Sequence, residues 1–297
     1  MHIKAKHWNI ILKVKSLFPS LDLKSEGIVI GRDTVSIVSR DSLLKEKGVS
    51  IFHDQENFKI KASKGYRKKL VKALEFYLPF FWVDKDCDYP RLCLHVAQSI
   101  DGKIATNFGS SKWIGNMENR IHSHRIRALV DAVIIGGNTI RNDKPKLNVR
   151  HVKGQDPVKV VISSKNNDYS SLKTSPDSKI ICFGKHNQDQ DGTKSINIEK
   201  NEDGVLCTES ILTSLKSQGI QSALLEGGKE TIHHFLAKDQ IDLVEFHIAP
   251  ILMGSGIQAI EMKEIKEISE ALALTKPEYV PFGDAILFRS HLQKSKS

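Results

Sequence analysis

A-Q-S-I-D-G-K-I-A-T, at residues 97–106, opens the stretch that decides the fold. S-K-W-I-G follows at 111–115, an amphipathic run ends at Arg127, and D-A-V-I-I-G-G-N-T-I-R-N-D-K-P-K-L-N-V-R occupies 131–150. Residues 132–135 are a short continuous apolar run, which is typical of a strand in a sheet covered on both faces. Two glycines follow it. Glycines between a strand and a helix let the backbone approach a ligand closely and offer unpaired N–H groups to an anion.

A second stretch has the same arrangement. It reads L-L-E-G-G-K-E-T-I-H-H-F-L at 224–236 and D-L-V-E-F-H-I-A-P-I-L-M-G-S-G at 242–256. A single strand followed by glycines often means only a tight turn. Two such turns indicate a ligand site, because open α/β sheets bind ligands at the carboxyl ends of their strands. We therefore expect the two stretches to form the halves of one nucleotide-and-phosphate site.

The chain from residue 91 onward alternates between strand and helix patterns. The predicted strands are 92–97, 132–135, 158–162, 179–183, 222–225, 243–249 and 285–289. Helices are predicted at 116–129, capped by Asn116, at 208–218, capped by Thr208, and at 229–237. This alternation predicts an α/β fold whose mostly parallel sheet is flanked by helices.

Residues 1–89 have a different pattern and predict a small α+β module. Helices are expected at 4–18 and from 64, and strands at 26–30, 35–39 and 57–62. The aromatic run F-Y-L-P-F-F-W at 76–82 follows basic residues. It has two interpretations: a stacking surface for single-stranded nucleic acid, or an apolar seam that packs against the next domain, which we favour. The α/β domain is expected at 90–292, with a frayed tail at 293–297.

Composition limits the class of protein. The formal net charge is +9, of which +6 lies in residues 1–89, and a basic balance favours phosphate-bearing partners without deciding the fold. The four cysteines form no C-x-x-C pair, and neither the zinc-deaminase motifs nor H-E-x-x-H occurs, so we expect no metal site and no zinc deaminase. No apolar run is long enough to span a bilayer. We therefore expect a cytoplasmic protein with reduced thiols.

Several single residues could bind a ligand. Lys103, Arg127, Arg141 and Arg150 are cations in the first stretch, and the fork of an arginine suits a phosphate. For each of them alone, a solvated surface charge is the interpretation we favour. Trp113 precedes a predicted helix, where its indole could flank a flat cofactor ring or lie in the core.

At these residues the sequence resembles the pyrimidine reductase family of riboflavin biosynthesis, which has a fold like dihydrofolate reductase. The resemblance covers roughly residues 90–292. It rests on S-I-D-G-K-I-A-T at 99–106, S-K-W-I at 111–114, E-G-G at 226–228 and A-P-I-L-M-G at 249–254. It also rests on the spaced set Thr139, Asp143, Pro145, Leu147 and Arg150. Several motifs in the right order are far more specific than any glycine pair.

The resemblance implies reduction of a phosphoribosylaminopyrimidine by NADPH, which converts the ribosyl group to a ribityl chain. Carried over by motif, the substrate-binding residues are Ser111, Arg127, Leu147, Arg150 and Glu226. The residues that line the NADPH site are Ala97, Trp113, Thr139, Asp143, Ser164, Gly228, Lys229, Glu230 and Thr231. Lys103 and Glu226 are the candidate catalytic residues, because a cation such as Lys103 beside the carbonyl or imine of the opened ribose would stabilise developing charge. A homodimer is also implied.

The sequence departs from the family in places and leaves alternatives open. Gly115 stands where bacterial members often have Thr, and residues 1–89 replace the deaminase that many relatives carry. One alternative is the same hydride chemistry on another pterin- or pyrimidine-like substrate. Another is a non-catalytic nucleotide or nucleic-acid binder that uses the basic N-terminal module. The sequence does not decide between the amino and oxo forms of the substrate.

Overall fold

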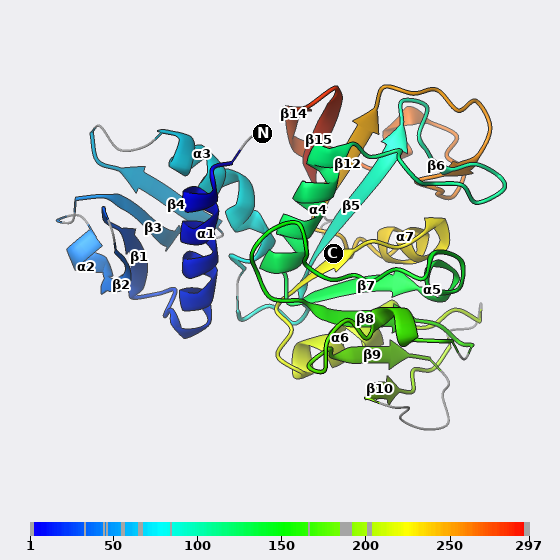
Figure 1. Cartoon of the computed structure of the whole chain (residues 1–297), viewed down its shortest axis with the longest axis horizontal. Helices are drawn as coiled ribbons and strands as arrows, with labels where there is room; N and C mark the ends of the chain where they lie inside the picture. The colour runs from blue at the N-terminus through cyan, green and yellow to red at the C-terminus, as the bar shows by residue number, and fades with distance from the viewer. Residues whose placement is uncertain are drawn as a thin grey trace. The chain divides into compact units, whose positions relative to one another are not determined.

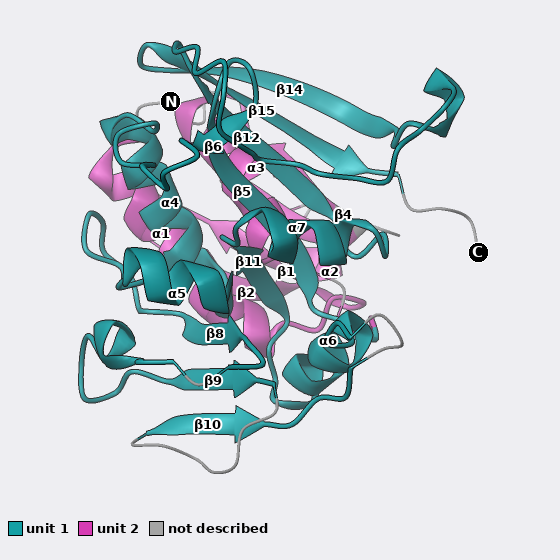
Figure 2. Ribbon diagram, turned by 90° about the vertical axis from the view of Figure 1, so that its right-hand side faces the viewer, with its two compact units in different colours: residues 1, 88–297 teal, residues 2–87 magenta. Residues whose placement is uncertain are grey.

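The chain consists of two compact units, which Figure 2 colours separately. One comprises residues 2–87, and the other comprises Met1 with residues 88–297. The computed structural model describes residues 3–32, 34–43, 45, 47–54, 57–64, 68–83, 85–165, 167–184, 192–200 and 204–293. None of the helices in these ranges is long and apolar enough to cross a membrane.

The N-terminal unit is built on a four-stranded antiparallel sheet. In chain order its elements are α1 (Ala5–Leu17), β1 (Glu26–Ile30), β2 (Val35–Ser39), α2 (Arg40–Leu43), β3 (Val49–Asp54), β4 (Asn57–Ala62) and α3 (Lys68–Tyr77). The strand order is β2-β1-β3-β4. The expected small α+β module is therefore present, although β3 was not predicted.

The aromatic run of this unit is buried. Phe76, Tyr77, Phe80, Phe81 and Trp82 are each less than a tenth exposed. The ring contacts that the structure describes lie inside the unit: Trp82 and Phe81 contact Phe18, Trp82 contacts Phe58, and Tyr77 contacts Trp8. The run thus builds the core of its own unit, and buried rings of this kind are not available to stack on bases.

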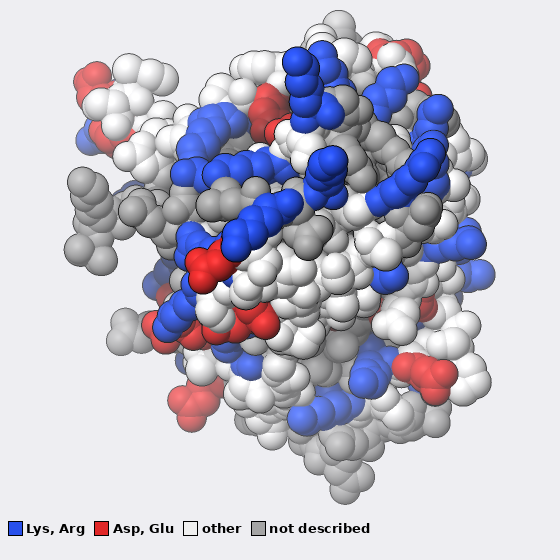
Figure 3. All heavy atoms as spheres, turned by 90° about the vertical axis from the view of Figure 1, so that its left-hand side faces the viewer, with Lys and Arg blue, Asp and Glu red and all other residues white. Residues whose placement is uncertain are grey.

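The surface in Figure 3 carries charges of both signs. Lys and Arg side chains are spread over this face, and Asp and Glu side chains lie among them. Exposed cations of the N-terminal unit include Lys59 and Lys61 on β4 and Lys68 and Lys69 on α3. A surface of mixed sign is the ordinary arrangement of a solvated protein.

The second unit contains a nine-stranded sheet in the order β10-β9-β8-β7-β11-β5-β12-β15-β14 (Figure 1). Its strands are β5 (Arg91–Ser99), β7 (Ala132–Gly136), β8 (Val158–Ile162), β9 (Ile180–Phe183), β10 (Thr193–Ile196), β11 (Ser222–Leu225), β12 (Leu243–Ala249), β14 (Leu274–Phe282) and β15 (Ala285–Leu292). The ladders from β10 to β12 are parallel, whereas β15 pairs antiparallel with both β12 and β14. The predicted α/β class and mostly parallel sheet are confirmed.

Helices lie against this sheet (Figure 2). They are α4 (Met117–Leu129), α5 (Gly137–Asp143), α6 (Thr208–Ser217) and α7 (Lys229–Leu236). Leu94, Ile134 and Leu225 belong to one apolar cluster with buried residues of α6 and α7. Because neighbouring strand residues point to opposite faces, His95 faces the other side, where it lies 5.2 Å, ring to ring, from His122 of α4.

Some elements differ from the prediction. Asn116 caps α4 as expected, with its side chain accepting a hydrogen bond from Asn119 N. Thr208 does not cap α6, because the helix begins at this residue and its N-cap is Cys207. The short helix α5 and the two-stranded sheet of β6 (Lys103–Ala105) and β13 (Ile257–Gln258) were not predicted. Elements this short carry too few residues to show a period.

Candidate functional site

A pocket of about 310 Å³ lies beside β5. Its walls come from β5, β6, the loop before α4, the first turns of α4 and the turn after β11. The lining residues include His95, Ala97, Ile104, Ser111, Gly115, Asn119 and Glu226. Three predicted site residues, Ala97, Ser111 and Glu226, thus meet at one cavity.

Arg127 and Glu226 form a two-pronged ion pair at the edge of this pocket. Arg127 Nε donates to Glu226 Oε1 at 2.8 Å, and Nη2 donates to Oε2 at 2.6 Å. The two side chains are only 13% and 15% exposed. Burial alone would lower the pKa of Arg127, but Glu226 raises it above its ordinary value. The pair therefore holds the guanidinium of Arg127 cationic in a partly dry site, where hydrogen bonds to charged groups are strong.

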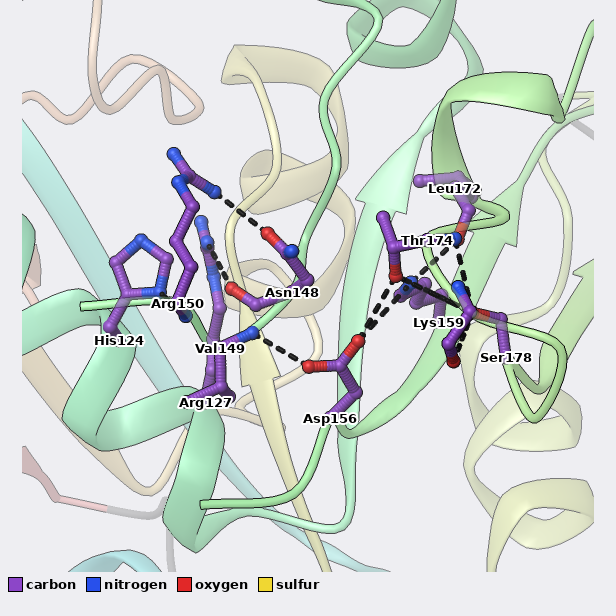
Figure 4. Close-up of polar contacts among 11 residues, drawn as sticks. His124, Arg127, Asn148, Val149, Arg150, Asp156, Lys159, Leu172, Thr174 and Ser178 are labelled. Carbon is purple, nitrogen blue, oxygen red and sulfur yellow. Dashed lines mark hydrogen bonds and ion pairs between the residues drawn. The ribbon is translucent and has the colours of Figure 1, made fainter. Parts of the chain in front are cut away.

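The loop after α5 carries the predicted residues Leu147 and Arg150 and contacts this pair through Asn148. Arg127 Nη1 donates to the Asn148 carbonyl oxygen at 3.4 Å, and Arg150 Nη1 donates to the Asn148 side-chain oxygen at 2.8 Å (Figure 4). Leu147 is buried and has a φ of +49°, a left-handed conformation that is costly for a residue with a Cβ. Strain of this kind persists where the surrounding contacts fix the backbone.

Asp156 supplies such contacts. Its Oδ1 accepts a hydrogen bond from Val149 N at 2.7 Å, and its Oδ2 accepts one from Thr174 Oγ1 at 3.1 Å (Figure 4). The buried Lys159 Nζ lies 3.7 Å from the same carboxylate and also donates to Leu172 O and Thr174 Oγ1. Asp156 thus ties the loop that carries Leu147 and Arg150 to the body of the sheet.

The surroundings of Arg150 are electropositive. Its backbone N–H donates to His124 Nδ1 at 3.1 Å. Burial, followed by the charges of Arg127 and Arg150, lowers the pKa of His124 to about 3. Burial and the charges of Arg127 and Arg120 lower the pKa of Arg150 itself. An anion beside these groups would relieve their mutual repulsion, so this end of the site favours one.

The two glycine turns lie side by side, because β7 and β11 are neighbours in the sheet. A Cβ on Gly136 would overlap the Thr231 hydroxyl, and a Cβ on Gly227 would lie 2.8 Å from Thr231 Cβ. A Cβ on Gly228, the N-cap of α7, would approach Thr139 Oγ1 at 3.8 Å. The glycines therefore let the N-terminal turns of α5 and α7 approach each other. The unpaired N–H groups of a helix N-terminus can bind a phosphate.

Other predicted residues lie away from the pocket lining. Trp113 is 78% exposed, has a φ of +74°, and has the Arg120 guanidinium 5.3 Å from its ring centroid. Asp143 ends α5 and Ser164 follows β8, and both are exposed. Lys103 lies on β6 next to Ile104. Ile104 lines the pocket, whereas Lys103 does not.

Lys229 and Glu230 open α7 and have partners of their own. Lys229 Nζ forms an ion pair with Glu261 at 2.7 Å. Glu230 Oε2 accepts a hydrogen bond from Asn138 Nδ2 at 3.1 Å, which links α7 to α5.

A buried polar network behind the pocket was not predicted from the sequence. Glu245 is fully buried on β12 and receives hydrogen bonds from His95 Nδ1 at 3.1 Å, from His122 Nε2 at 2.8 Å and from Arg289 Nε at 2.7 Å. His95 Nε2 lies 3.0 Å from the Asn119 side-chain oxygen. The sequence does contain one indication of this network, since Glu245 and His247 stand inside the apolar strand 243–249. A strand covered on both faces rarely carries charge without a partner.

The ligand atoms of His95, His122 and Glu245 lie within 4.8 Å of one another, as in a metal site. Burial alone would raise the pKa of Glu245, but the Arg289 guanidinium and His122 hold it well below its ordinary range. The charge of the carboxylate is therefore already compensated by Arg289, with which it forms a buried ion pair. A divalent cation would compete with this arginine, so the network is better described as a charge-paired polar core.

Comparisons with known proteins identify the family of the second unit. The family described as the RibD C-terminal domain matches residues 90–288. A riboflavin biosynthesis protein RibD from Aquifex aeolicus is 32% identical over 204 residues, which are 67% of this chain and 57% of that protein. A 2,5-diamino-6-ribosylamino-4(3H)-pyrimidinone 5′-phosphate reductase from Methanothermobacter thermautotrophicus is 27% identical over 67% of this chain and 96% of that protein.

A solved structure of a deaminase/5-amino-6-(5-phosphoribosylamino)uracil reductase from Thermotoga maritima is also similar. It is 25% identical, has a TM-score of 0.57, and the match covers 76% of this chain and 62% of that one. The chain spans only 57% and 51% of the lengths of two curated RibD relatives. Since the family match covers most of the chain and the predicted motifs lie within it, the chain belongs to the RibD C-terminal domain family.

Proposed function

We propose that this protein is an NADPH-dependent reductase of riboflavin biosynthesis. Its reaction would convert the ribosyl group of a 5-amino-6-(5-phosphoribosylamino)pyrimidine to a ribityl chain. The observation that carries the proposal is the partly buried Arg127–Glu226 pair at the edge of the pocket, next to the paired glycine turns. The family and the activities named for the relatives support the same reaction.

The substrate would bind between the pocket and the loop that carries Leu147 and Arg150. Arg150 and the positive field around it suit the 5-phosphate, because a guanidinium matches phosphate geometry. Glu226 and Arg127 offer charged groups to the polar edge of the pyrimidine. Ser111 also lines the pocket.

NADPH would extend from the pocket across the two glycine turns. Gly228, Lys229, Glu230 and Thr231 surround the start of α7, and Thr139 lies beside Gly228. Ala97 would border the nicotinamide in the pocket, and Trp113, Asp143 and Ser164 would contact outer parts of the cofactor. When bound, the cofactor supplies a hydride to C1′ of the ribosyl group. The protein would fix the two reactants in the geometry for this transfer.

Lys103 remains a proposed catalytic residue with Glu226. In the structure Ile104, the strand neighbour of Lys103, lines the pocket, so Lys103 would act only if β6 shifts when ligands bind.

The proposal includes a cytoplasmic homodimer and gives the N-terminal unit no role in the chemistry. The nucleic-acid alternative lacks its aromatic surface, since the rings of the N-terminal run are buried.

Steady-state rates on a panel of substrates test this proposal. The panel contains the amino and oxo forms of the phosphoribosylaminopyrimidine, their dephosphorylated forms, and pterins. We expect turnover of one phosphorylated form, with a product two hydrogen atoms heavier by mass spectrometry. Faster turnover of a pterin would instead support the alternative reductase, and NADPH binding without any turnover would contradict both.

A further inference from the structure

A chain of polar side chains runs from β15 to the pocket wall. Arg289 is 2% exposed and pairs with Glu245, which accepts a hydrogen bond from His95 Nδ1. The other ring nitrogen of His95 faces the side-chain oxygen of Asn119 at 3.0 Å. His95 and Asn119 both line the pocket. Because a carboxylate and an amide oxygen are both acceptors, both nitrogens of His95 are placed to carry hydrogen.

The proposed reaction needs a proton. The role inferred below for a proton donor therefore rests on the proposed function. Reduction of a ribosyl to a ribityl group forms a C1′–H bond with the incoming hydride and breaks the C1′–O4′ bond. The electron pair of the broken bond stays on O4′. Since the hydride leaves the nicotinamide oxidised and brings no proton, one proton has to reach O4′ from the protein or from solvent.

Two titratable side chains occur among the described residues that line the pocket, Glu226 and His95. Both oxygens of Glu226 accept hydrogen bonds from Arg127, so both are already occupied. On the pocket side of His95, Nε2 faces the side-chain oxygen of Asn119. A substrate oxygen could replace Asn119 there as the acceptor. Catalytic hydrogen bonds of this kind often form only when the substrate is bound.

We propose that His95 donates the proton that O4′ takes up when the ribosyl ring opens, with Glu245 holding the imidazole in place. In this step the Nε2–H bond of His95 breaks, its electron pair stays on nitrogen, and an O–H bond forms at O4′. Solvent later returns a proton to the ring. The titratable and charged groups that face His95 are Glu245 and His247 on β12 and His122 on α4, and Arg289 on β15 pairs with Glu245.

His95→Gln tests the proposal, because glutamine keeps a hydrogen-bonding side chain but cannot deliver a proton. With the preferred phosphoribosylaminopyrimidine, we expect kcat to fall about 100-fold or more, the typical contribution of a general acid. The affinity for NADPH, measured by fluorescence titration, stays unchanged. A general acid has to be protonated, so the parent should have a high-pH limb in kcat that is absent in His95→Gln.

His247→Gln is the matched control. His247 is also a buried histidine on the same face of the sheet, opposite Ala97 in the β5–β12 ladder, but it does not line the pocket. It should keep both kcat and the high-pH limb.

An NMR experiment adds a readout that is independent of turnover. The histidine Cε1–H signal that is missing in His95→Gln should shift when the ribityl product is added to the parent without NADPH.

Turnover by the parent together with an unchanged kcat and pH profile in His95→Gln would overturn the role of His95 and leave the reductase proposal standing. Absence of turnover in the parent would instead contradict the reductase proposal itself. If His95→Gln does not fold, as judged by its melting temperature, His95→Asn is used in its place. An unmoved His95 signal on addition of product also counts against the role of His95.

Discussion

At the scale of single residues, the Arg127–Glu226 pair makes the sharpest prediction. Glu226→Gln removes the charge that compensates a guanidinium whose side chain is only 13% exposed. Loss of one partner from a desolvated ion pair costs a few kcal/mol, so we expect kcat/KM to fall about 100-fold. NADPH affinity should change little. Glu209→Gln is the control, because Glu209 lies 3.9 Å from Lys238 in an exposed pair and should leave kcat/KM unaltered. Equal kcat/KM in Glu226→Gln and the parent would show that the pair does not bind substrate.

The sequence predicted these two residues because each belongs to a motif. Arg127 ends an amphipathic run, and Glu226 precedes two glycines after a strand. His95, Asn119 and Arg289 were missed, since they are far apart in the sequence and belong to no motif. Their meeting depends on the register of β5 with β12 and of β12 with β15, which places His95 opposite Glu245 and Glu245 opposite Arg289. Register is a property of the folded sheet that no local pattern in one strand contains.

At the scale of elements, the loop between α5 and β8 should depend on Asp156. Asp156→Ala removes the acceptors of Val149 N and Thr174 Oγ1 and the ion-pair partner of Lys159. The loop that carries Leu147 and Arg150 would lose its fixed position, so we expect KM for the phosphorylated substrate to rise about tenfold or more.

The control for this loop is Asp168→Ala, whose carboxylate accepts a hydrogen bond from Ser170 N in a different loop. Steady-state kinetics at saturating NADPH measures both variants. An equal rise of KM in both, or in neither, would contradict the role of Asp156.

Elements with a clear period were predicted within a few residues of their bounds. β8, β11 and β12 match the expected ranges, because runs of apolar or alternating residues define them. α5 was missed since it is seven residues long and begins with glycine, and β14 was missed since two prolines interrupt its pattern. The aromatic run 76–82 showed its apolar character in the sequence, but only the fold shows that its rings contact α1 and β4.

At the scale of the whole molecule, buried histidines predict how stability depends on pH. Burial lowers the pKa of His122 and of His247 to about 4, and burial together with nearby arginines lowers that of His124 to about 3. In the unfolded chain each titrates near 6.5. Unfolding therefore takes up protons between about pH 6.5 and pH 4, so stability falls as the pH falls through this window, by up to ~1.4 kcal/mol per pH unit for each histidine.

Glu245 affects the free energy of unfolding at lower pH, because its pKa is held well below its ordinary range. Its contribution to stability is present above the unfolded value of about 4.5 and is lost as the pH falls through the folded value. Urea unfolding at a series of pH values measures both effects. His122→Gln should flatten the dependence between about pH 6.5 and pH 4, because one titrating group is removed. A free energy of unfolding that does not change across this range in the parent would contradict the burial of these histidines in the neutral form.

The measurement that tests the central claim most directly is the transfer of deuterium. The protein is incubated with NADPH deuterated at C4 of the nicotinamide and with each form of the phosphoribosylaminopyrimidine, and the product is examined by NMR and mass spectrometry. We predict one deuterium at C1′ of a ribityl chain, from one of the two stereospecifically labelled cofactors. A product without deuterium, or labelled NADPH that binds and is not oxidised with either substrate, would contradict the claim that this pocket reduces a ribosylaminopyrimidine.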